Sequence, residues 1–600
     1  MKFFSTLAAS TLGTLIALGI AVLFFFMFIF ALAASSEDVP RVREGTLLVA
    51  ELSGGMPELV SGDPFAQLLA NEPSLDLRSA KRAFEKAAVD DRITGLWLRV
   101  RSSSIPWAAT QELRASIAEF KSTGKPVYAS SDDFMTMEGE YFLLSVADSV
   151  FAAPGGLFEF NGFAIVATFY KGLLDKLGIE PQIVRSGKFK SAVEPFQRSS
   201  MSEENRQQLN DLLVAQEGVY LQTISEARGL SVEELRERAS NDAILRVDEA
   251  VDMGLVDELI YNDQVIARWK ERLAVEPDGK LKTISLARYA KVPASSAGLK
   301  EGKAGKIAIV YAVGTIVGGA SDEETPFSAG VIGSETFAKA IKEARESDDV
   351  KAVVLRIDSP GGFAPAADAM LREVELTAAK KPVVVSMANV AASGGYWMAM
   401  AADTIVAEPL TLTGSIGAFS LFFNTSAFFD DKLGITFDRV RTSPYADMLS
   451  GVRALSEAET RLLQDLTDET YTRFIDIVAE NREMTTEDVQ ELAQGRVWMG
   501  IQAKDVGLVD VLGGLGDATE IAADLAGLEP GSYSTRSLPR PKTFLERMTR
   551  SLEAEAVSAW THVTTSAAER AMREQMKALE EALRDHATVQ ARMAFDIRID

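Results

Sequence analysis

The fold of this chain is decided by two short apolar stretches, Ile93-Thr-Gly-Leu-Trp-Leu-Arg-Val100 and Val350-Lys-Ala-Val-Val-Leu-Arg-Ile357. Each is typical of a buried β-strand, because it is short, mostly apolar and rich in branched residues. Both end in Leu-Arg followed by a branched residue, 257 residues apart. Similarity at a fixed distance indicates that one structural unit occurs twice.

Three further pairs of segments repeat at nearly the same distance, 255 or 256 residues. The pairs are Lys125-Pro126-Val127 with Lys381-Pro382-Val383, Ala147-Asp148 with Ala402-Asp403, and Asp175-Lys-Leu-Gly-Ile179 with Asp431-Lys-Leu-Gly-Ile435. Between them, short branched runs alternate with longer amphipathic segments such as 110–120 and 367–379. This alternation is typical of βαβ units around a parallel sheet. The sequence therefore predicts a tandem duplication of an α/β domain.

The predicted domains follow from these repeats. We expect a membrane anchor and juxtamembrane segment at residues 1–45, a first repeat at 46–300, a second repeat at 301–540 and a helical tail at 541–600. The segment 291–305 contains Pro293, two serines and three glycines and marks the boundary between the repeats. The tail is charged and Ala-rich, and it has Met572, Met576, Leu579 and Leu583 at helical spacing.

An uncharged segment, Phe3 to Ser36, precedes the repeats. A membrane-spanning helix needs about 20 apolar residues, whereas the apolar part of a cleavable signal has about 7–15. The length favours an uncleaved anchor, although Ala31-Leu32-Ala33 resembles a cleavage site and leaves removal open. In both alternatives the rest of the chain is exported from the cytoplasm. The positive charge of Lys2 before the apolar segment favours a cytoplasmic N-terminus.

Composition excludes several kinds of site. The chain has no cysteine, which rules out a thiol nucleophile, a disulfide and a Cys-ligated zinc. The only histidines, His562 and His586, lie in the tail, where we expect no catalytic role. The net charge of −24 argues against binding to nucleic acid. We expect no metal, nucleotide or organic cofactor.

Glycine and serine follow two strands of the second repeat. The first strand continues as Asp358-Ser-Pro-Gly-Gly362, where backbone N–H groups can point at a ligand oxygen. The second continues into Ser393-Gly394-Gly395, at the start of a predicted Ala- and Met-rich helix. The Gly394 N–H then lies beside the Ser393 hydroxyl. Taken alone, a tight turn and an N-cap serine are the favoured explanations of these residues.

A lysine-containing segment, Ser186-Gly-Lys188-Phe-Lys190-Ser191, follows a strand of the first repeat. A lysine replaces histidine as a general base if a dry pocket lowers its pKa. Most lysines are solvated, so spacing alone does not select Lys190 as that base. Lys188 is the alternative.

Taken together, these motifs resemble the signal peptide peptidase A family, in the long, two-repeat form of bacterial inner membranes. The resemblance covers residues 44–531. It includes Ser-Pro-Gly-Gly, Ala-Ser-Gly-Gly-Tyr, Thr-Gly-Ser-Ile-Gly and Gly-x-Phe-Lys-Ser-Ala-x-Glu-Pro. It implies that each repeat has a crotonase/Clp-protease-like α/β fold.

The resemblance also implies the roles of individual residues. Ser393 is the expected nucleophile and Lys190 the expected general base. Gly362 matches a position that supplies an oxyanion N–H, together with Gly394. Ser415 matches a serine that orients the lysine amine.

The duplication predicts that the two repeats share one site. Aligning the copies shows that the first lacks the nucleophile and the oxyanion glycines, and that the second lacks the lysine. The aligned positions are Glu138 with Ser393, Ser104-Ile105 with Gly361-Gly362, and Lys190 with Ala446. We therefore expect Lys190 and Ser393 to meet in one composite site per chain.

By resemblance, the expected protein is a membrane-anchored serine endopeptidase that degrades released signal peptides and short unfolded hydrophobic peptides. It would be a homotetramer in the bacterial inner membrane, with a single span and the bulk of the chain in the periplasm. Two alternatives from other classes are a catalytically silent membrane-anchored scaffold of the same fold and an acyl-CoA enzyme of the crotonase type.

Overall fold

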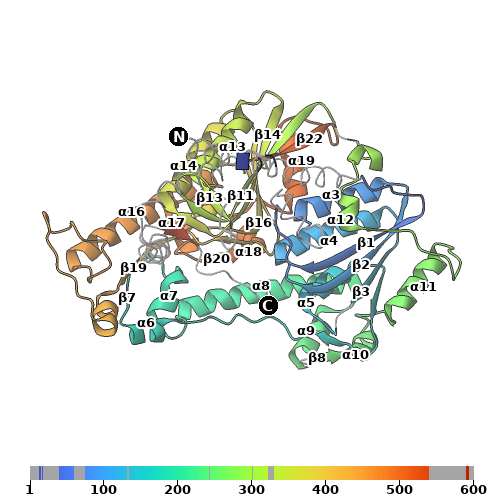
Figure 1. Cartoon of the computed structure of the whole chain (residues 1–600), viewed down its shortest axis with the longest axis horizontal. Coiled ribbons are helices and arrows are strands. Elements are labelled where there is room, and N and C mark those ends of the chain that lie inside the picture. Colours follow the sequence, from blue (N-terminus) through green and yellow to red (C-terminus); the bar gives the residue numbers. More distant parts are fainter. Residues whose placement is uncertain are drawn as a thin grey trace, which may run out of the picture.

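The computed structural model describes residues 39–59, 75–131, 134–241, 244–300, 302–321, 330–539 and 590–592, with four single positions before residue 21. Within these residues, two α/β units lie side by side (Figure 1). A long helix, α8 (Glu203–Arg228), runs along both units, since it contacts a helix of the first and a strand of the second.

The first unit is built on a parallel sheet with the order β10-β1-β2-β3-β5-β9. Strand β2 (Ile93–Ser103) contains the first repeated stretch. Its side chains alternate between two apolar layers, with Leu96 and Leu98 facing helices α3 and α4, and Trp97 facing α11. The other elements are β1 (Thr46–Gly54), β3 (Val127–Ser131), β5 (Ser149–Ala152), β9 (Glu258–Leu259), β10 (Thr283–Ser285), α3 (Leu77–Val89), α4 (Trp107–Ser122), α5 (Glu138–Leu144) and α11 (Asn262–Arg272).

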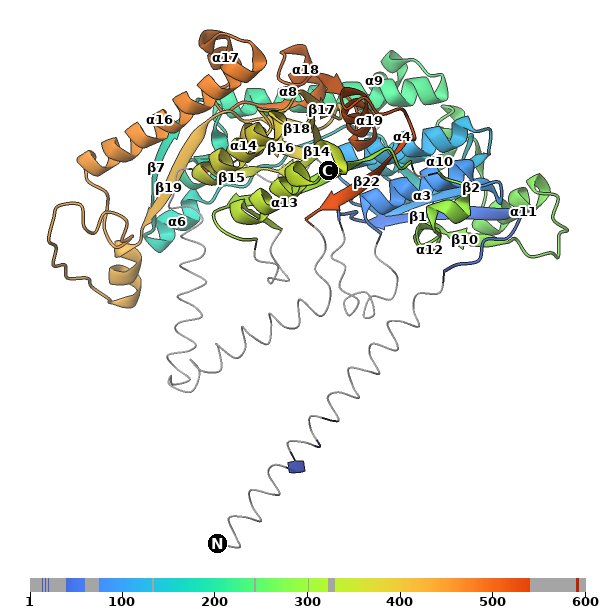
Figure 2. The same cartoon turned by 90° about the horizontal axis from the view of Figure 1, so that it is seen from above.

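The second unit repeats this plan in the parallel strands β22-β11-β14-β16-β17-β21, where β21 is Val511–Leu512, and the same sheet also contains β18, which pairs with β16, and β20, which pairs antiparallel with β18. Strand β14 (Val350–Ser359) contains the second repeated stretch and is buried on both faces. Helices α13 and α14 cover one face and α19 the other (Figure 2). The elements are β11 (Gly305–Val313), β16 (Val383–Ala392), β17 (Thr404–Ala407), β18 (Leu412–Gly414), β20 (Val497–Met499), β22 (Tyr533–Leu538), α13 (Ser334–Glu346), α14 (Ala364–Ala378), α15 (Gly394–Trp397), α16 (Glu457–Arg482) and α19 (Leu515–Leu525).

The predicted duplication is visible in matching side-chain bonds. In the first unit Tyr141 Oη donates to Leu255 O at 2.7 Å, and in the second Tyr396 Oη donates to Leu508 O at 2.8 Å. Matching backbone bonds join Val127 N to Asp148 Oδ2 and Val383 N to Asp403 Oδ2. Buried polar groups need such partners, so these bonds recur with the fold. The prediction of a duplicated α/β domain is confirmed.

A third, mixed sheet joins the two units, with the order β13-β12-β15-β23-β19-β7. Strand β7 (Glu180–Ser186) of the first repeat pairs antiparallel along its whole length with β19 (Ala418–Asn424) of the second. The two strands lie together near α16 in Figure 1. The lysine segment that follows β7 is therefore carried onto the second unit. The remaining strands are β12 (Thr315–Val317), β13 (Val331–Gly333), β15 (Gly361–Phe363) and β23 (Gln590–Arg592).

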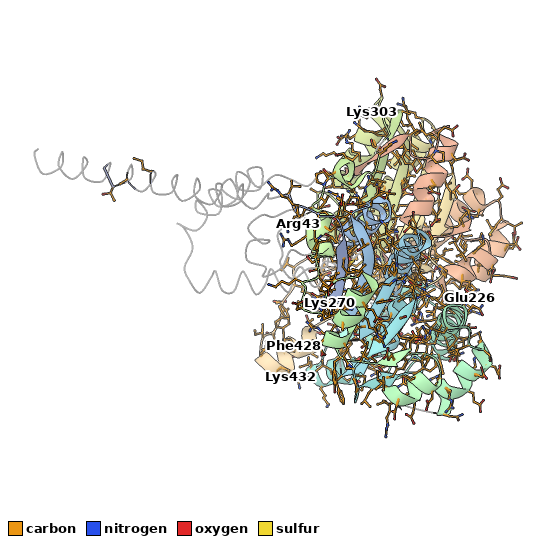
Figure 3. All side chains as sticks on the ribbon, turned by 90° about the vertical axis from the view of Figure 1, so that its right-hand side faces the viewer. Arg43, Glu226, Lys270, Lys303, Phe428 and Lys432 are labelled. Carbon is orange, nitrogen blue, oxygen red and sulfur yellow. The ribbon has the colours of Figure 1, made fainter. Side chains whose placement is uncertain are left out.

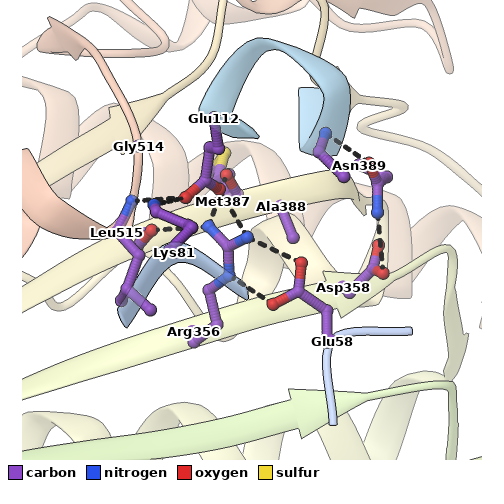
Figure 4. Close-up of polar contacts among 12 residues, drawn as sticks. Glu58, Lys81, Glu112, Arg356, Asp358, Met387, Ala388, Asn389, Gly514 and Leu515 are labelled. Atoms are coloured by element: carbon purple, nitrogen blue, oxygen red, sulfur yellow. Dashed lines mark hydrogen bonds and ion pairs between the residues drawn. The ribbon is translucent and has the colours of Figure 1, made fainter. Parts of the chain in front are cut away.

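A buried cluster of charges also joins the units (Figure 4). Arg356 on β14 donates to both carboxylate oxygens of Glu58 and to Glu112 Oε1 at 2.6 Å, and Lys81 pairs with the same Glu112. Burial opposes the charge of Glu112, but Arg356 and Lys81 lower its pKa to about 2. Glu408 lies close by, and burial, followed by the charge of Glu112, raises its pKa to about 8.

The two ends of the chain lie mostly outside the described residues. This holds for most of the predicted anchor segment, residues 1–45, and for His562 and His586. Among the residues that the structure describes, no helix is both long and apolar enough to cross a membrane. Of the predicted helical tail, residues 541–600, the structure describes only 590–592, which form strand β23.

Candidate active site

The lysine segment is clamped between the two repeats. After β7, Phe189 N donates to Gln494 O of the second repeat at 2.8 Å. From helix α8, Gln208 Nε2 donates to Phe189 O at 3.2 Å and to Ser191 Oγ at 3.0 Å. The backbone on either side of Lys190 is thus held by hydrogen bonds, which fixes the direction of its side chain.

The Lys190 side chain is fully buried and reaches both predicted serines. Its Nζ lies 2.7 Å from Ser393 Oγ, 3.0 Å from Ser415 Oγ and 2.8 Å from Ser415 O. Burial in this dry site lowers the pKa of Lys190 well below its usual value of 10.5. The structure therefore brings together three side chains that the sequence analysis singled out.

The three contacts of Lys190 can be made by an uncharged amine as well as by an ammonium, and burial favours the uncharged form. A neutral amine has two N–H groups and one lone pair, whereas an ammonium has three donors and no acceptor. Two N–H groups are satisfied by Ser415 O and Ser415 Oγ. The lone pair is then free to accept the hydroxyl proton of Ser393.

Ser393 stands at a strained turn between β16 and α15. Its φ of 54° and ψ of −117° are rarely adopted by residues with a side chain. Its backbone N donates to Gly414 O at 2.8 Å, while its carbonyl accepts from Trp397 N at 2.8 Å. These bonds fix the strained backbone and with it the hydroxyl.

The predicted helix after Ser393 is present and short, because α15 ends at Trp397. Beyond it, Ala399 N and Met400 N donate three residues back, to Tyr396 O and Trp397 O. The backbone tightens into such turns at a helix end, so this segment continues as turns.

The Gly362 backbone needs a residue without a side chain. Its φ is 154°, and an added Cβ would lie 2.2 Å from Ile316 O on the neighbouring β12. Gly394 is the first residue of α15, directly after the Ser393 hydroxyl. Its N–H therefore belongs to the first turn of a helix, where N–H groups lack intrahelical acceptors.

Strand β23 occupies the edge of β15 beside these glycines. It runs antiparallel to β15, with Ala591 opposite Gly362, and it also pairs with β19 at Phe419. An extended segment of the chain thus fits between β15 and β19. This sheet edge accepts an added strand next to the predicted oxyanion glycines.

The rival lysine and the residues aligned with Lys190 and Ser393 in the other repeat lie outside this site. Lys188 is exposed, with its Nζ 5.1 Å from the centre of the Phe189 ring. Ala446, aligned with Lys190, is exposed. Glu138, aligned with Ser393, is buried and accepts from the backbone of the segment after β6 (Leu157–Glu159).

Sequence reasoning missed one residue that shapes the lysine site. Gly495 has a φ of 80°, and an added Cβ would lie 2.5 Å from the Lys190 Cβ. The only signal in the sequence was its place in the turn Gln494-Gly495 before β20. The contact between Gly495 and Lys190 arises from tertiary packing, which a single sequence does not show.

A dry lysine amine against a strained serine hydroxyl is the arrangement of a serine hydrolase that uses lysine where others use histidine. Comparisons with known proteins narrow this class. The pattern of peptidase family S49 matches residues 119–276 and 375–529, one match in each repeat. The chain therefore belongs to peptidase family S49, in the long form with two repeats, and it is a serine protease.

Individual relatives agree with this assignment. Serine protease SPPA, chloroplastic, from Arabidopsis thaliana is 38% identical over 510 residues, which cover 84% of this chain and 73% of the relative. Protease 4 from Salmonella typhi is 37% identical over 458 residues, which cover 74% and 71%. Among solved structures, ClpP1 from Listeria monocytogenes is similar at 17% identity and a TM-score of 0.22, covering 35% of this chain and 92% of its own.

Proposed function

We propose that this serine protease is a membrane-anchored endopeptidase that uses Ser393 as nucleophile and Lys190 as general base to degrade released signal peptides. The observation that carries the dyad is the fully buried Lys190 Nζ, 2.7 Å from Ser393 Oγ. A general base needs to lie within about 2.6–3.2 Å of the proton that it takes.

The proposed reaction is acyl transfer. Neutral Lys190 takes the proton of Ser393 as Oγ attacks the peptide carbonyl carbon, and the Gly362 and Gly394 N–H groups hold the oxyanion. Lys190 then gives this proton to the leaving amine, and the peptide C–N bond breaks. This leaves the peptide joined to Ser393 Oγ as an ester. Lys190 then takes a proton from a water molecule, the water hydrolyses the ester, and Lys190 returns the proton to Ser393 Oγ. Ser415 keeps the amine aimed at the nucleophile through its two contacts.

The substrate is proposed to bind as an extended strand. Strand β23 supports this, because its antiparallel pairing with β15 uses the edge that a peptide needs in order to reach Gly362. The proposal that the substrate is an apolar signal peptide follows from the resemblance of the sequence motifs to those of the family. The uncharged segment from Phe3 to Ser36 supports an anchor, which would raise the local concentration of membrane-bound peptides.

A homotetramer is the proposed assembly. Two surface segments support it, at residues 163–178 and 433–449, because they expose large apolar side chains. Val166 is 91% exposed and Val440 is fully exposed, and Leu173, Tyr445 and Leu449 are each more than half exposed. Figure 3 shows the neighbouring Phe428 and Lys432 at the rim of the molecule. Clustered apolar surface of this kind marks protein contacts.

The decisive experiment compares peptide hydrolysis by the wild type, Ser393→Ala, Lys190→Ala and Lys188→Ala. We expect the first two substitutions to abolish turnover and the third to leave it unchanged, because Lys188 is exposed. A fluorophosphonate probe should label the wild type at Ser393. Full activity of Lys190→Ala would refute the proposed base, and activity of Ser393→Ala would refute the dyad.

A further inference from the structure

Strand β16 carries a bulge shortly before the nucleophile. Three of its residues, 388–390, lie opposite the single residue Asp358 of β14. The flanking pairs are Ile357 with Met387 and Ser359 with Ala391. On its other side, β16 pairs with β17 before the bulge and with β18 after it. Bulges next to active sites re-aim the strand that follows, and here that strand leads directly to Ser393.

The Asp358 carboxylate fills the gap that the bulge opens in the ladder. Its Oδ1 accepts from Val390 N at 3.0 Å, and its Oδ2 accepts from Asn389 Nδ2 at 3.2 Å. Asp358 begins the segment that ends in Gly362, and Asn389 begins the segment that ends in Ser393. One carboxylate therefore ties the oxyanion strand to the nucleophile strand.

The Asn389 side chain also reaches the first repeat (Figure 4). Its Oδ1 accepts from Ala109 N at 3.0 Å, in the first turn of α4. The N-cap residue of α4 is Pro106, whose side chain makes no capping bond. Asn389 thus supplies an acceptor to a helix of the other repeat. The same helix holds Glu112, the partner of Arg356, so α4 is joined to the second sheet at two points.

The first repeat offers an internal comparison. Its strands β2 and β3 pair up to Val100 and Ser131, which align with Ile357 and Met387, the last pair before the bulge. The next residue in β2 is Arg101, where the second repeat has Asp358. The repeat without a nucleophile therefore also lacks the aspartate.

We propose that Asn389 and Asp358 are positioning residues that fix the β16 bulge and so hold the Ser393 hydroxyl against Lys190 of the other repeat. Neither touches the reacting atoms. They act by setting the path of the backbone over the last residues before Ser393. The inference rests on the proposed dyad, since it concerns the alignment of that pair.

The test uses a reversal of donor and acceptor. Asn389→Asp keeps the acceptor for Ala109 N but sets a carboxylate against Asp358. In the double variant Asn389→Asp/Asp358→Asn, the amide at position 358 donates to the carboxylate at position 389, so the bond is restored in reverse. A misplacement of about 1 Å costs about 10²-fold in rate. We expect a loss of that order in kcat for Asn389→Asp, with little change in KM, and recovery of most of it in the double variant.

Asn424→Asp is the matched control. Asn424 Nδ2 donates to Glu180 Oε2 at 3.0 Å, and its Oδ1 accepts from Ser426 N, so the substitution makes the same chemical change at the far end of β19. It should leave kcat unchanged. Fluorophosphonate labelling of Ser393 and the melting temperature are measured in parallel, because a misaligned hydroxyl slows labelling in a folded protein.

Two outcomes would overturn the inference. One is a double variant in which the losses of kcat caused by the two substitutions add, so that no activity is recovered. The other is an Asn389→Asp protein that melts earlier but has wild-type kcat and labelling rate per folded molecule. Both are distinguishable from failure of the dyad, which shows as residual activity in Ser393→Ala.

Discussion

Burial, rather than a neighbouring charge, sets the chemistry of Lys190. Desolvation lowers its pKa, and within the described part of the chain its amine forms hydrogen bonds only with the two serines. Lys188, two residues away, is exposed. The sequence does not distinguish these two lysines by spacing, because only tertiary packing decides which one loses its water. The family motif pointed to Lys190, and the structure places that residue in the site.

The lowered pKa of Lys190 predicts the pH dependence of the reaction. The base works only when it is neutral, so kcat/KM should rise with pH through the pKa of this amine and then level off. Because burial lowers that pKa, the rise should lie well below pH 10.5. The measurement is kcat/KM for a peptide without titratable groups.

Lys188→Ala is the control for this profile and should give the same curve. A rise that stays near the pKa of a solvated lysine would contradict a buried base. The same burial affects stability, because between the usual lysine pKa of 10.5 and the lowered pKa of Lys190 only the unfolded chain binds the proton. Stability should therefore fall as the pH drops from about 10.5 towards the lowered pKa of Lys190, and level off below it.

At the level of elements, the sequence predicted the strands that precede Gly362 and Ser393, but not the path of the backbone from each strand to these residues. Alternation and branched residues identify a strand, and glycines mark its end. The bulge in β16 depends on a carboxylate from another strand and a helix from another repeat. Such long-range contacts leave no local pattern in the sequence.

Gly362→Ala tests the oxyanion strand. An added Cβ would clash with Ile316 O, so β15 must move away from β12 and carry the Gly362 N–H with it. Loss of one oxyanion donor costs about 10²–10³-fold in kcat. We expect a loss of this size, measured as kcat on a peptide substrate at saturation.

Gly516→Ala provides the matched comparison, because its added Cβ on α19 meets open space. It should retain wild-type kcat. Equal activity of the Gly362 and Gly516 variants would show that this strand does not hold the oxyanion.

At the scale of the molecule, the charge cluster between the repeats makes stability depend on pH. Burial raises the pKa of Glu408 to about 8, above the usual 4.5. The folded state therefore retains a proton that the unfolded state releases, and stability falls as the pH rises between these two values. One such proton contributes a slope of up to about 1.4 kcal/mol per pH unit.

Glu408→Gln removes this titration. Chemical denaturation of the wild type and the variant at several pH values should therefore give curves that diverge, with the variant gaining relative stability from pH 5 to pH 8. Parallel curves would mean that Glu408 ionises in the folded protein as it does in the unfolded chain. The sequence could not predict this cluster, because its members come from five separate segments.

The pairing of β23 with β15 predicts that residues 590–592 compete with peptide substrates for the same edge of β15. It pairs with the edge of β15 beside Gly362, the edge proposed for peptides. A variant that ends at residue 589 should therefore show a higher kcat/KM for short peptides, through a lower KM. The control is the rate at which a small fluorophosphonate labels Ser393. This rate should not change, because the probe is too small to use the edge of β15. An unchanged KM would show that peptides bind elsewhere.

The composite site also has a consequence for synthesis of the protein on the ribosome. Lys190 is made 203 residues before Ser393, and its loop is closed by Gln494, which is made later still. Until then the amine is in water, where a lysine stays protonated at neutral pH. With Lys190 as the proposed base, the growing chain has no working base at that stage. We therefore expect proteolytic activity only once the second repeat has folded over the first, which would make completion of the fold the activation step.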